Sequence, residues 1–496
     1  MTEVSRAEES RVKVFYPIEE PYVYVVISED PNSGEITYKV IEPTLTSEDK
    51  MILEKIKKIF LDELDVDLME LSKEEAHKFL EKRIRKIVKD YKIKIDEGQL
   101  NKILYYLKRD FLGYGKIDAL MKDHYVEDIS CDGVNVPIYI WHREYESIKT
   151  NIIYDNEEEL NNFVVRLAYL CGKHISVAQP ILDASLPDGS RVNATFSTEI
   201  SRRGTTFTIR KFRSDPITII DLIQFGTISV ELAAYFWFAV ENKASILVAG
   251  ETAAGKTTML NCLSMFIRPE LKIITIEETP ELNLPHTNWI PMVTRTGFGI
   301  SASEMKLFDL LKNAMRQRPD YIIVGEIRGA EAYTLFQALA TGHGVQSTIH
   351  AESPEKVISR LESHPMNVPK PMIELLDIIV VQGRVKIGNR PARRTLYVSE
   401  IKGYNREKDE IELHYFSKWD PITDKHIIEK ESIVLNRIAE RKGMTIEDIN
   451  TNIRKKTIIL SWMLKKGIRR YSDIGRILRD YYVDSERVFG QALVES

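Results

Sequence analysis

A glycine-rich loop between an apolar segment and a helical pattern constrains the fold of this chain more than any other feature. Residues 245–249 are mostly apolar, as in a buried strand, and residues 250–257 fit the spacing G-x-x-x-x-G-K-[ST]. Glycines let such a loop wrap closely around phosphate groups, and the helix that starts at Lys256 directs the positive end of its dipole at the same anion. The segment therefore predicts a strand–loop–helix unit that binds nucleotide phosphates.

This loop predicts ATP and Mg²⁺ as cofactors. Lys256 would reach the β- and γ-phosphates, and the hydroxyl of Thr257 would ligate Mg²⁺. An incidental glycine-rich turn is the alternative, but the strand before the loop and the helical pattern after it argue against that reading. The residues expected to bind the nucleotide are Gly250, Glu251, Thr252, Ala253, Ala254, Gly255, Lys256, Thr257 and Thr258.

A second apolar segment, residues 321–324, is followed by Gly325 and Glu326. We expect Glu326 to orient and polarise the attacking water, but Gly325 stands where an aspartate usually supports Mg²⁺. Glu277 and Glu278 end another predicted strand and would supply that support, with Glu277 bound directly or through water, because ligands bind at the carboxyl ends of parallel strands. Each of these acids could instead serve only as a helix cap.

A polar segment at residues 341–350 forms a third candidate part of the site. Alternation along a strand would place Gln346, Thr348 and His350 on one face, which suits contact with a γ-phosphate. The spacing of His343 and His350 is not a usual metal-ligand spacing. We therefore take His350 as a candidate site residue, whereas His343 fits a structural role equally well.

The remaining pattern indicates an α/β chain with several parts. Strands alternate with helices from residue 245 to about residue 382, which predicts a mostly parallel sheet. A strand hairpin, a small helical bundle and an α+β segment precede it and end at a polar linker. The expected divisions are residues 1–112 for the hairpin and bundle, 113–213 for the N-terminal α+β domain, 214–222 for the linker, 223–385 for the ATPase core and 386–496 for C-terminal strands and helices.

Composition argues against several other classes of protein. The 496 residues include 69 basic and 74 acidic side chains, a net charge of −5, and so show no basic footprint of a nucleic-acid binder. Cys131, Cys171 and Cys262 form no C-x-x-C pair, which argues against a zinc site or a disulfide framework. No signal peptide is visible, and the apolar run at residues 232–240 is too short to span a membrane. We expect a cytoplasmic protein that meets a membrane through partners.

Four boxes in this order resemble those of the type II/IV secretion system ATPase family, which includes secretion, type IV pilus and archaellum ATPases. They are the loop at 250–257, the acids Glu277 and Glu278, the Gly-Glu-Ile-Arg segment at 325–328, and the histidine segment at 341–350. Segments similar to the archaeal branch in particular lie at residues 126–130, 186–191 and 278–289.

The chain departs from the family pattern at three points. Glu278 stands where aspartate is usual, which places more weight on Glu277. Ala253 and Ala254 stand where glycine or small polar residues are common, although the phosphate-cradling glycines are intact. The four-cysteine insertion found in many bacterial secretion members is missing.

The resemblance implies a RecA-like P-loop ATPase domain in a homohexamer that powers assembly of pilus or archaellum filaments, or protein secretion. In the family, arginines of the N-terminal domain complete the nucleotide site, and the candidates are Arg191, Arg203 and Arg210, with Arg328 beside Glu326 as another. Any one of them could form only a surface salt bridge. The implied partners are a polytopic membrane platform protein at the inner face of the cell membrane and other assembly or secretion components.

Two other functions use the same ATPase core. A nucleic-acid helicase or translocase would need a basic channel with stacking aromatic residues, and the sequence shows neither. A nucleotide sensor that does not hydrolyse ATP would not need the complete set of Lys256, Thr257 and Glu326. We therefore expect a hydrolysing motor without a nucleic-acid partner.

Overall fold

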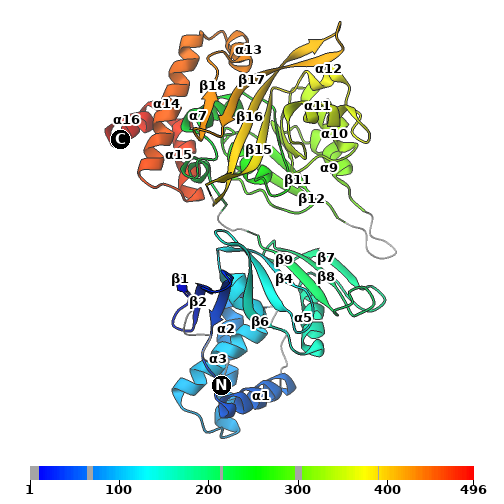
Figure 1. Cartoon of the computed structure of the whole chain (residues 1–496), viewed down its shortest axis with the longest axis vertical. Helices are drawn as coiled ribbons and strands as arrows, with labels where there is room; N and C mark the ends of the chain where they lie inside the picture. Colours follow the sequence, from blue (N-terminus) through cyan, green and yellow to red (C-terminus); the bar gives the residue numbers. More distant parts are fainter. Residues whose placement is uncertain (1–10, 64–70, 213–215, 296–303, 389, 496) are drawn as a thin grey trace. The chain divides into compact units, whose positions relative to one another are not determined.

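Two β-sheets organise the chain, and each belongs to its own unit. The computed structural model describes residues 11–63, 71–212, 216–295, 304–388 and 390–495. It separates the unit Met1–Arg213 from the unit Ser214–Ser496 (Figure 1). This division differs from the larger number of segments expected from the sequence, and the pairing of the strands explains the difference.

The N-terminal unit contains a nine-stranded sheet with the strand order β1-β2-β3-β6-β5-β4-β9-β8-β7. The expected hairpin, β2 and β3, joins this sheet because β3 pairs in parallel with β6, where Tyr38 lies opposite Thr150. The hairpin and the α+β segment therefore share one core, and the expected division after residue 112 does not separate two units within the described residues. The strands are β1 Arg11–Glu19, β2 Val23–Glu29, β3 Ile36–Ile41, β4 Val126–Cys131, β5 Pro137–His142, β6 Glu146–Ile153, β7 Ile181–Ser185, β8 Arg191–Thr195 and β9 Thr206–Arg210.

Three helices form the expected bundle, and each begins at a capping box. Thr46, Ser72 and Asp96 are the N-caps of α1, α2 and α3, and each accepts a hydrogen bond from the backbone N–H three residues later. Leucine and isoleucine side chains at helical spacing meet in a core of their own. The helices of this unit are α1 Ser47–Asp62, α2 Lys73–Asp90, α3 Glu97–Phe111, α4 Asp118–Lys122 and α5 Glu157–Leu170.

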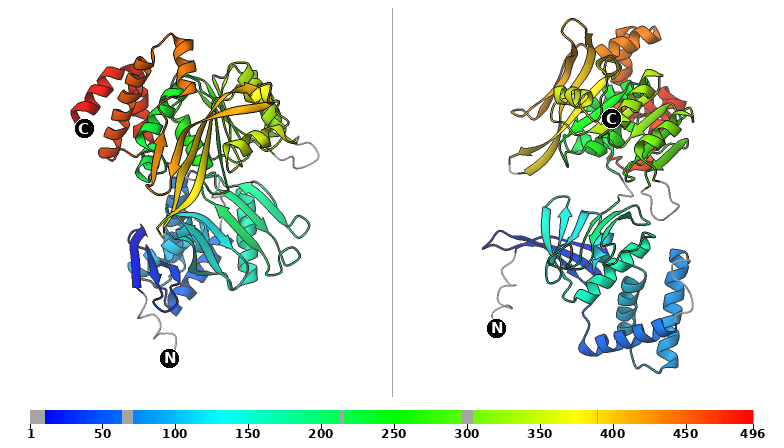
Figure 2. Two further views of the ribbon diagram at one scale, coloured as in Figure 1. Left: turned by 45° about the horizontal axis from the view of Figure 1, so that its top comes forward. Right: turned by 90° about the vertical axis from the view of Figure 1, so that its right-hand side faces the viewer.

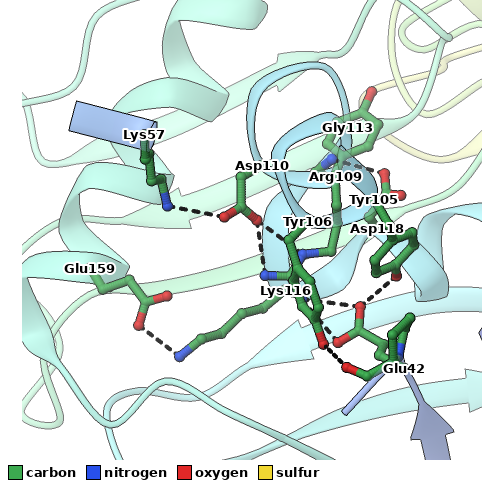
Figure 3. Close-up of polar contacts among 12 residues, drawn as sticks. Glu42, Lys57, Tyr105, Tyr106, Arg109, Asp110, Gly113, Lys116, Asp118 and Glu159 are labelled. Atoms are coloured by element: carbon green, nitrogen blue, oxygen red, sulfur yellow. Dashed lines mark hydrogen bonds and ion pairs between the residues drawn. The ribbon is translucent and has the colours of Figure 1, made fainter. Parts of the chain in front are cut away.

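A largely buried arginine joins the bundle to the sheet (Figure 3). Arg109 on α3 donates to both carboxylate oxygens of Glu42, which follows β3, at 3.0 and 2.9 Å, and it pairs with Asp110 at 2.9 Å. Its guanidinium lies 4.7 Å from the centroid of the Tyr106 ring. Lys57 of α1 reaches Asp110 at 3.0 Å, so one network connects α1, α3 and the end of β3.

The C-terminal unit is a RecA-like α/β domain with the strand order β12-β11-β13-β14-β10-β15-β16-β17-β18. Neighbouring strands from β12 to β15 pair in parallel, and those from β15 to β18 pair antiparallel. Because β15 spans the expected boundary at residue 385, the C-terminal strands extend the ATPase sheet. The strands are β10 Ile246–Gly250, β11 Ile273–Glu277, β12 Trp289–Val293, β13 Tyr321–Val324, β14 Gly344–Ile349, β15 Ile378–Ile387, β16 Arg390–Asn405, β17 Glu410–Asp420 and β18 Lys425–Ile428.

Helices cover both faces of this sheet (Figures 1 and 2). Successive side chains of β10 point alternately to the two faces and pack in a different core on each. Ile246 and Val248 pack in the core with α6–α8 and α13–α16, whereas Leu247 and Ala249 pack in the core with α9–α12. Among the described residues, no helix is long and apolar enough to cross a membrane. The helices are α6 Ile219–Gln224, α7 Val230–Glu241, α8 Lys256–Ser264, α9 Leu307–Met315, α10 Glu331–Ala340, α11 Pro354–Glu362, α12 Lys370–Ile373, α13 Ile433–Lys442, α14 Ile446–Lys465, α15 Tyr471–Val483 and α16 Ser485–Glu495.

Part of the expected linker at residues 214–222 is helical. Helix α6 begins at Ile219 behind a capping box formed by Thr218 and Asp221. The apolar side chains of α6 are buried in the core with α7 and α8, which the polar residues around Pro216 do not indicate. Residues 213–215 lie outside the described part of the chain.

Replacing Arg109 with alanine should weaken the connection between the bundle and the sheet by about 3 kcal/mol, because Glu42 and Asp110 would keep their partly buried charges without the shared cation. Hydrogen exchange followed by mass spectrometry should show faster exchange in α1 and α3. Arg85→Ala is the matched control, since Arg85 of α2 forms solvent-exposed pairs with Glu81 of the same helix and Glu97 of α3, and such pairs contribute little to stability. Equal protection in the two variants would contradict this role of Arg109.

Candidate active site

The glycine-rich loop leads from β10 into α8 and leaves the first turn of that helix without a side-chain cap. Gly255 is the N-cap of α8, with a φ of 89°, and no side chain accepts a hydrogen bond from that turn. Unpaired N–H groups at a helix N-terminus bind anions. Thr257 and Thr258 lie in this turn and are half-buried, whereas Ala254 is buried beneath the loop. The backbone is therefore arranged to receive phosphate.

Lys256 is buried, and its ammonium group points into the site. Its Nζ donates to the carbonyl of Glu251 at 2.9 Å and lies 3.3 Å from Nδ1 of His350. Because an ammonium group can only donate, Nδ1 of His350 accepts and Nε2 carries the proton. Burial lowers the pKa of Lys256, and burial together with the charge of Lys256 lowers the pKa of His350. His350 is therefore neutral near pH 7 and presents an N–H group.

That N–H group faces Glu326, the acid that follows β13. Nε2 of His350 lies 2.9 Å from Oε1 of Glu326, although the angle falls outside that of a hydrogen bond. The other oxygen of Glu326 accepts from Nη2 of Arg328 at 2.5 Å. Arg328 also lies 3.5 Å from Glu278. The fold thus brings Lys256, His350, Glu326, Arg328 and Glu278 into one chain of contacts.

Glu277 is buried at the end of β11, and its Oε1 accepts hydrogen bonds from the backbone N–H groups of Glu281 and Leu282 at 2.9 and 3.0 Å. Burial raises the pKa of Glu277 to about 7. A Cβ built at Gly325 would lie 3.2 Å from Cγ of Glu277. The side chain of Glu277 therefore occupies space next to the position where an aspartate is usual, and a larger residue there would require Glu277 to shift.

The oxygen donors of Thr257 and Glu277 are of the kind that Mg²⁺ prefers. Among the described residues, no group of three or more His, Cys, Asp or Glu side chains is arranged to hold a metal ion. In a Mg²⁺–nucleotide complex, the oxygens of Thr257 and Glu277 would be joined by phosphate oxygens and water as ligands.

A cavity of about 630 Å³ opens beside the loop. Its lining combines loop residues with cations from the strand ends and from α11, so an anion would be favoured in it. Gly250, Glu251, Thr252, Arg328, His350, Lys356, Arg360 and His364 are among the lining residues.

Two residues near the loop were not expected from the sequence. A Cβ built at Gly250, whose φ is 152°, would lie 2.5 Å from the carbonyl oxygen of Gln382 on β15. Nε of Arg393 on β16 donates to the carbonyl of Ala253 at 3.0 Å. The one feature of the sequence that could have pointed to Arg393 is the composition of residues 383–394, which contain several basic residues and no acidic ones. Only the pairing of β10 with β15 shows that this run lies beside the loop.

Other residues of the expected polar face do not reach the loop. Gln346 is buried and accepts a hydrogen bond from Ser264 at 2.7 Å, and Thr348 donates to the carbonyl of Gly325 at 2.8 Å. Nδ1 of His343 lies 3.0 Å from the carbonyl of Ala338 at the end of α10. Of the expected histidine segment, only His350 lines the site.

The candidate arginines of the N-terminal domain lie in a different unit from the loop. Arg191 and Arg210 face each other across β8 and β9, and Arg191 also pairs with Asp183 at 2.9 Å. Arg203 is exposed between β8 and β9. Arg191, Arg203 and Arg210 therefore remain predictions as phosphate contacts.

The raised pKa of Glu277 predicts a pH-dependent stability in protein without nucleotide or magnesium. A carboxyl whose pKa is higher in the folded state stabilises the fold fully below its unfolded pKa of 4.5, and the stabilisation is lost as the pH rises through about 7. Glu277→Gln should remove this part of the decline in melting temperature between pH 5 and pH 8, and Glu278→Gln, at an exposed carboxylate, should not. The same decline in Glu277→Gln as in the wild type would contradict the assignment.

Comparisons with known proteins place the chain in a family. The family model described as type II/IV secretion system protein matches residues 117–390. An uncharacterized protein of Methanocaldococcus jannaschii is 37% identical over 492 residues, which cover 95% of this chain and 89% of that protein. The type IV secretion system protein PtlH of Bordetella pertussis is 30% identical over 272 residues, which cover 48% of this chain and 80% of PtlH.

Among solved structures, the ATPase DotB of Yersinia pseudotuberculosis is 17% identical, with a TM-score of 0.43 over 72% of this chain and 90% of DotB. The sequence matches carry the conclusion, together with the phosphate-binding loop described above. The chain therefore belongs to the type II/IV secretion system protein family, as one of its ATP-hydrolysing enzymes.

Proposed function

We propose that this enzyme is a Mg²⁺-dependent homohexameric motor that powers assembly of pilus or archaellum filaments, or protein secretion, from the cytoplasmic side of the cell membrane. The observation that carries the proposal is the chain of contacts from Lys256 through His350 to Glu326 beside one phosphate-binding loop, in a chain of the secretion family. Family membership supports a polytopic membrane platform protein and other assembly or secretion components as partners.

The residues of the C-terminal unit divide the chemistry between them. When ATP binds, Lys256 would leave the carbonyl of Glu251 and the ring of His350 and would contact the β- and γ-phosphates instead. Thr257 and Glu277 would hold Mg²⁺, which neutralises charge on the phosphates, and the backbone of Gly250, Glu251, Thr252, Ala253, Ala254, Gly255 and Thr258 would surround them. Glu326 would orient the attacking water once its oxygens are no longer engaged by Arg328 and His350.

The expected need for an arginine from the N-terminal unit at the nucleotide site supports the hexamer. A phosphoryl-transfer site gains several orders of magnitude in rate from an arginine that neutralises developing charge. Arg328 already pairs with Glu326 within the same chain. Arg191 and Arg210 lie at one end of the β8–β9 hairpin and Arg203 lies in the loop at its other end. Any of them could serve the same chain or a neighbouring copy in a ring.

A nucleic-acid translocase and a nucleotide sensor are the alternatives. The near-balanced charge of the chain does not favour a strand-binding channel. Hydrolysis that single-stranded DNA does not stimulate would exclude the translocase, and steady turnover would exclude the sensor. DNA-stimulated turnover would instead overturn the motor proposal.

Two substitutions should abolish hydrolysis for different reasons. Lys256→Ala removes a charge that faces the phosphates, so nucleotide affinity should fall by about tenfold or more. Glu326→Gln should keep the affinity and reduce turnover by about a hundredfold or more. Calorimetric titration and a phosphate-release assay measure the two quantities.

The matched control for Glu326→Gln is Glu352→Gln, because Glu352 is an exposed acid beside the same cavity that pairs with Lys356. Turnover at the wild-type rate in Glu326→Gln would refute the role of Glu326. Cells that carry Glu326→Gln in place of the wild type should lack the filament or the secreted product, and an unchanged phenotype would refute the motor role.

A non-hydrolysable ATP analogue should promote hexamers. The expected shift from smaller species to a hexamer is measured by size-exclusion chromatography with multi-angle light scattering. Arg210→Ala should weaken the shift if this arginine reaches the nucleotide of a neighbouring copy, because the nucleotide then bridges two chains. A monomer at every protein concentration and in every nucleotide state would refute the hexamer.

A further inference from the structure

We propose that Arg393 is a positioning residue that holds the phosphate-binding loop in its binding-competent shape by hydrogen-bonding the strained peptide at Ala253. The inference rests on the nucleotide site proposed above. It adds to that site a residue of the β15–β16 hairpin that does not belong to any of the four sequence boxes.

Ala253 has a backbone conformation that an alanine rarely adopts. Its φ is 61°, in the left-handed region, where a Cβ approaches the following carbonyl group. Glycine carries no such penalty and is the usual residue wherever a tight loop needs this conformation. The loop of this chain therefore needs a contact elsewhere that favours the strained form.

Arg393 supplies such a contact. Its Nε donates to the carbonyl of Ala253 at 3.0 Å, which fixes the orientation of the strained peptide. A Cβ built at Gly255 would lie 3.3 Å from Cδ of Arg393, so the stem of the arginine also packs over the end of the loop. With Gln382 next to Gly250, the hairpin touches the loop at its beginning, its middle and its end.

The strand that carries Arg393 is firmly anchored. Arg394, the next residue, has a side chain only 7% exposed and forms two hydrogen bonds with Asp424, at 2.7 and 2.9 Å. It also donates to the carbonyl of Phe225 at 3.0 Å. This guanidinium lowers the pKa of Asp424 to about 2. Arg393 therefore extends from an anchored strand, from which its donor group can hold the loop in one shape.

A fixed loop has a direct consequence for binding. If the loop had to adopt the strained conformation only when the nucleotide arrives, the cost of ordering it would be subtracted from the binding free energy. Because the contact with Arg393 holds this conformation before the nucleotide binds, the cost is part of the free energy of folding and is not subtracted from the free energy of binding. Arg393 should accordingly affect the affinity for nucleotide more than the rate of hydrolysis.

Direct contact between Arg393 and a phosphate is the competing explanation, since the side chain is exposed near an anion site. The two explanations differ in how they depend on Ala253. A loop support becomes unnecessary when residue 253 is a glycine, whereas a direct phosphate contact does not depend on the strain at residue 253.

The test is the dissociation constant for Mg²⁺ with a non-hydrolysable ATP analogue, and for ADP, measured by calorimetry on the full chain. Arg393→Gln should weaken both by about fivefold, the usual effect of one lost hydrogen bond, with little change in kcat. Ala253→Gly in the Arg393→Gln background should restore most of the affinity that Arg393→Gln loses.

Lys386→Gln is the matched control, because it removes one exposed positive charge from the same hairpin away from the loop. It should bind nucleotide like the wild type, and all variants should remain folded at the temperature of the assay. Unchanged affinity in Arg393→Gln, or a loss that Ala253→Gly does not reverse, would overturn the proposal. A wild-type chain that binds no nucleotide would instead overturn the proposed function, so the two failures are distinct.

Discussion

The parallel pairing of β10 with both β14 and β15 is the constraint on which the C-terminal unit depends. All five residues of β10 are buried, and the strand ends opposite Ile349 on one side and Gln382 on the other. This register delivers His350 to one flank of the loop and the β15–β16 hairpin to its other flank. The phosphate site is therefore assembled by the sheet, and the loop residues form only its centre.

Charged groups of opposite sign meet at this sheet edge. Lys256 and Arg328 engage the groups that we expect to act on ATP, namely His350 and Glu326. A triphosphate with its metal ion would compete for the same cations, because phosphate oxygens bind lysine and arginine strongly. In the proposed function the substrate would replace these contacts and free Glu326 from Arg328.

Local sequence patterns were enough to predict the central strands of the ATPase sheet. The strands expected at residues 273–276 and 321–324 appear as β11 and β13, and the RecA-like fold and the family are confirmed. Long-range pairings were not predictable. The contact between Arg393 and Ala253 joins residues 140 positions apart, and the entry of the hairpin into the N-terminal sheet depends on the β3–β6 pairing. Neither pairing leaves a periodic pattern or a motif in the sequence. The roles of the site residues remain predictions.

The most direct test of this account is the position of the metal ion. Crystals of the protein with Mn²⁺ in place of Mg²⁺ and a non-hydrolysable ATP analogue would locate the metal by its anomalous scattering. We expect one ion beside the hydroxyl of Thr257, with Glu277 as a ligand or joined to it through water, and the phosphates on the loop. A metal held by other acids, or a nucleotide away from Lys256, would contradict the account.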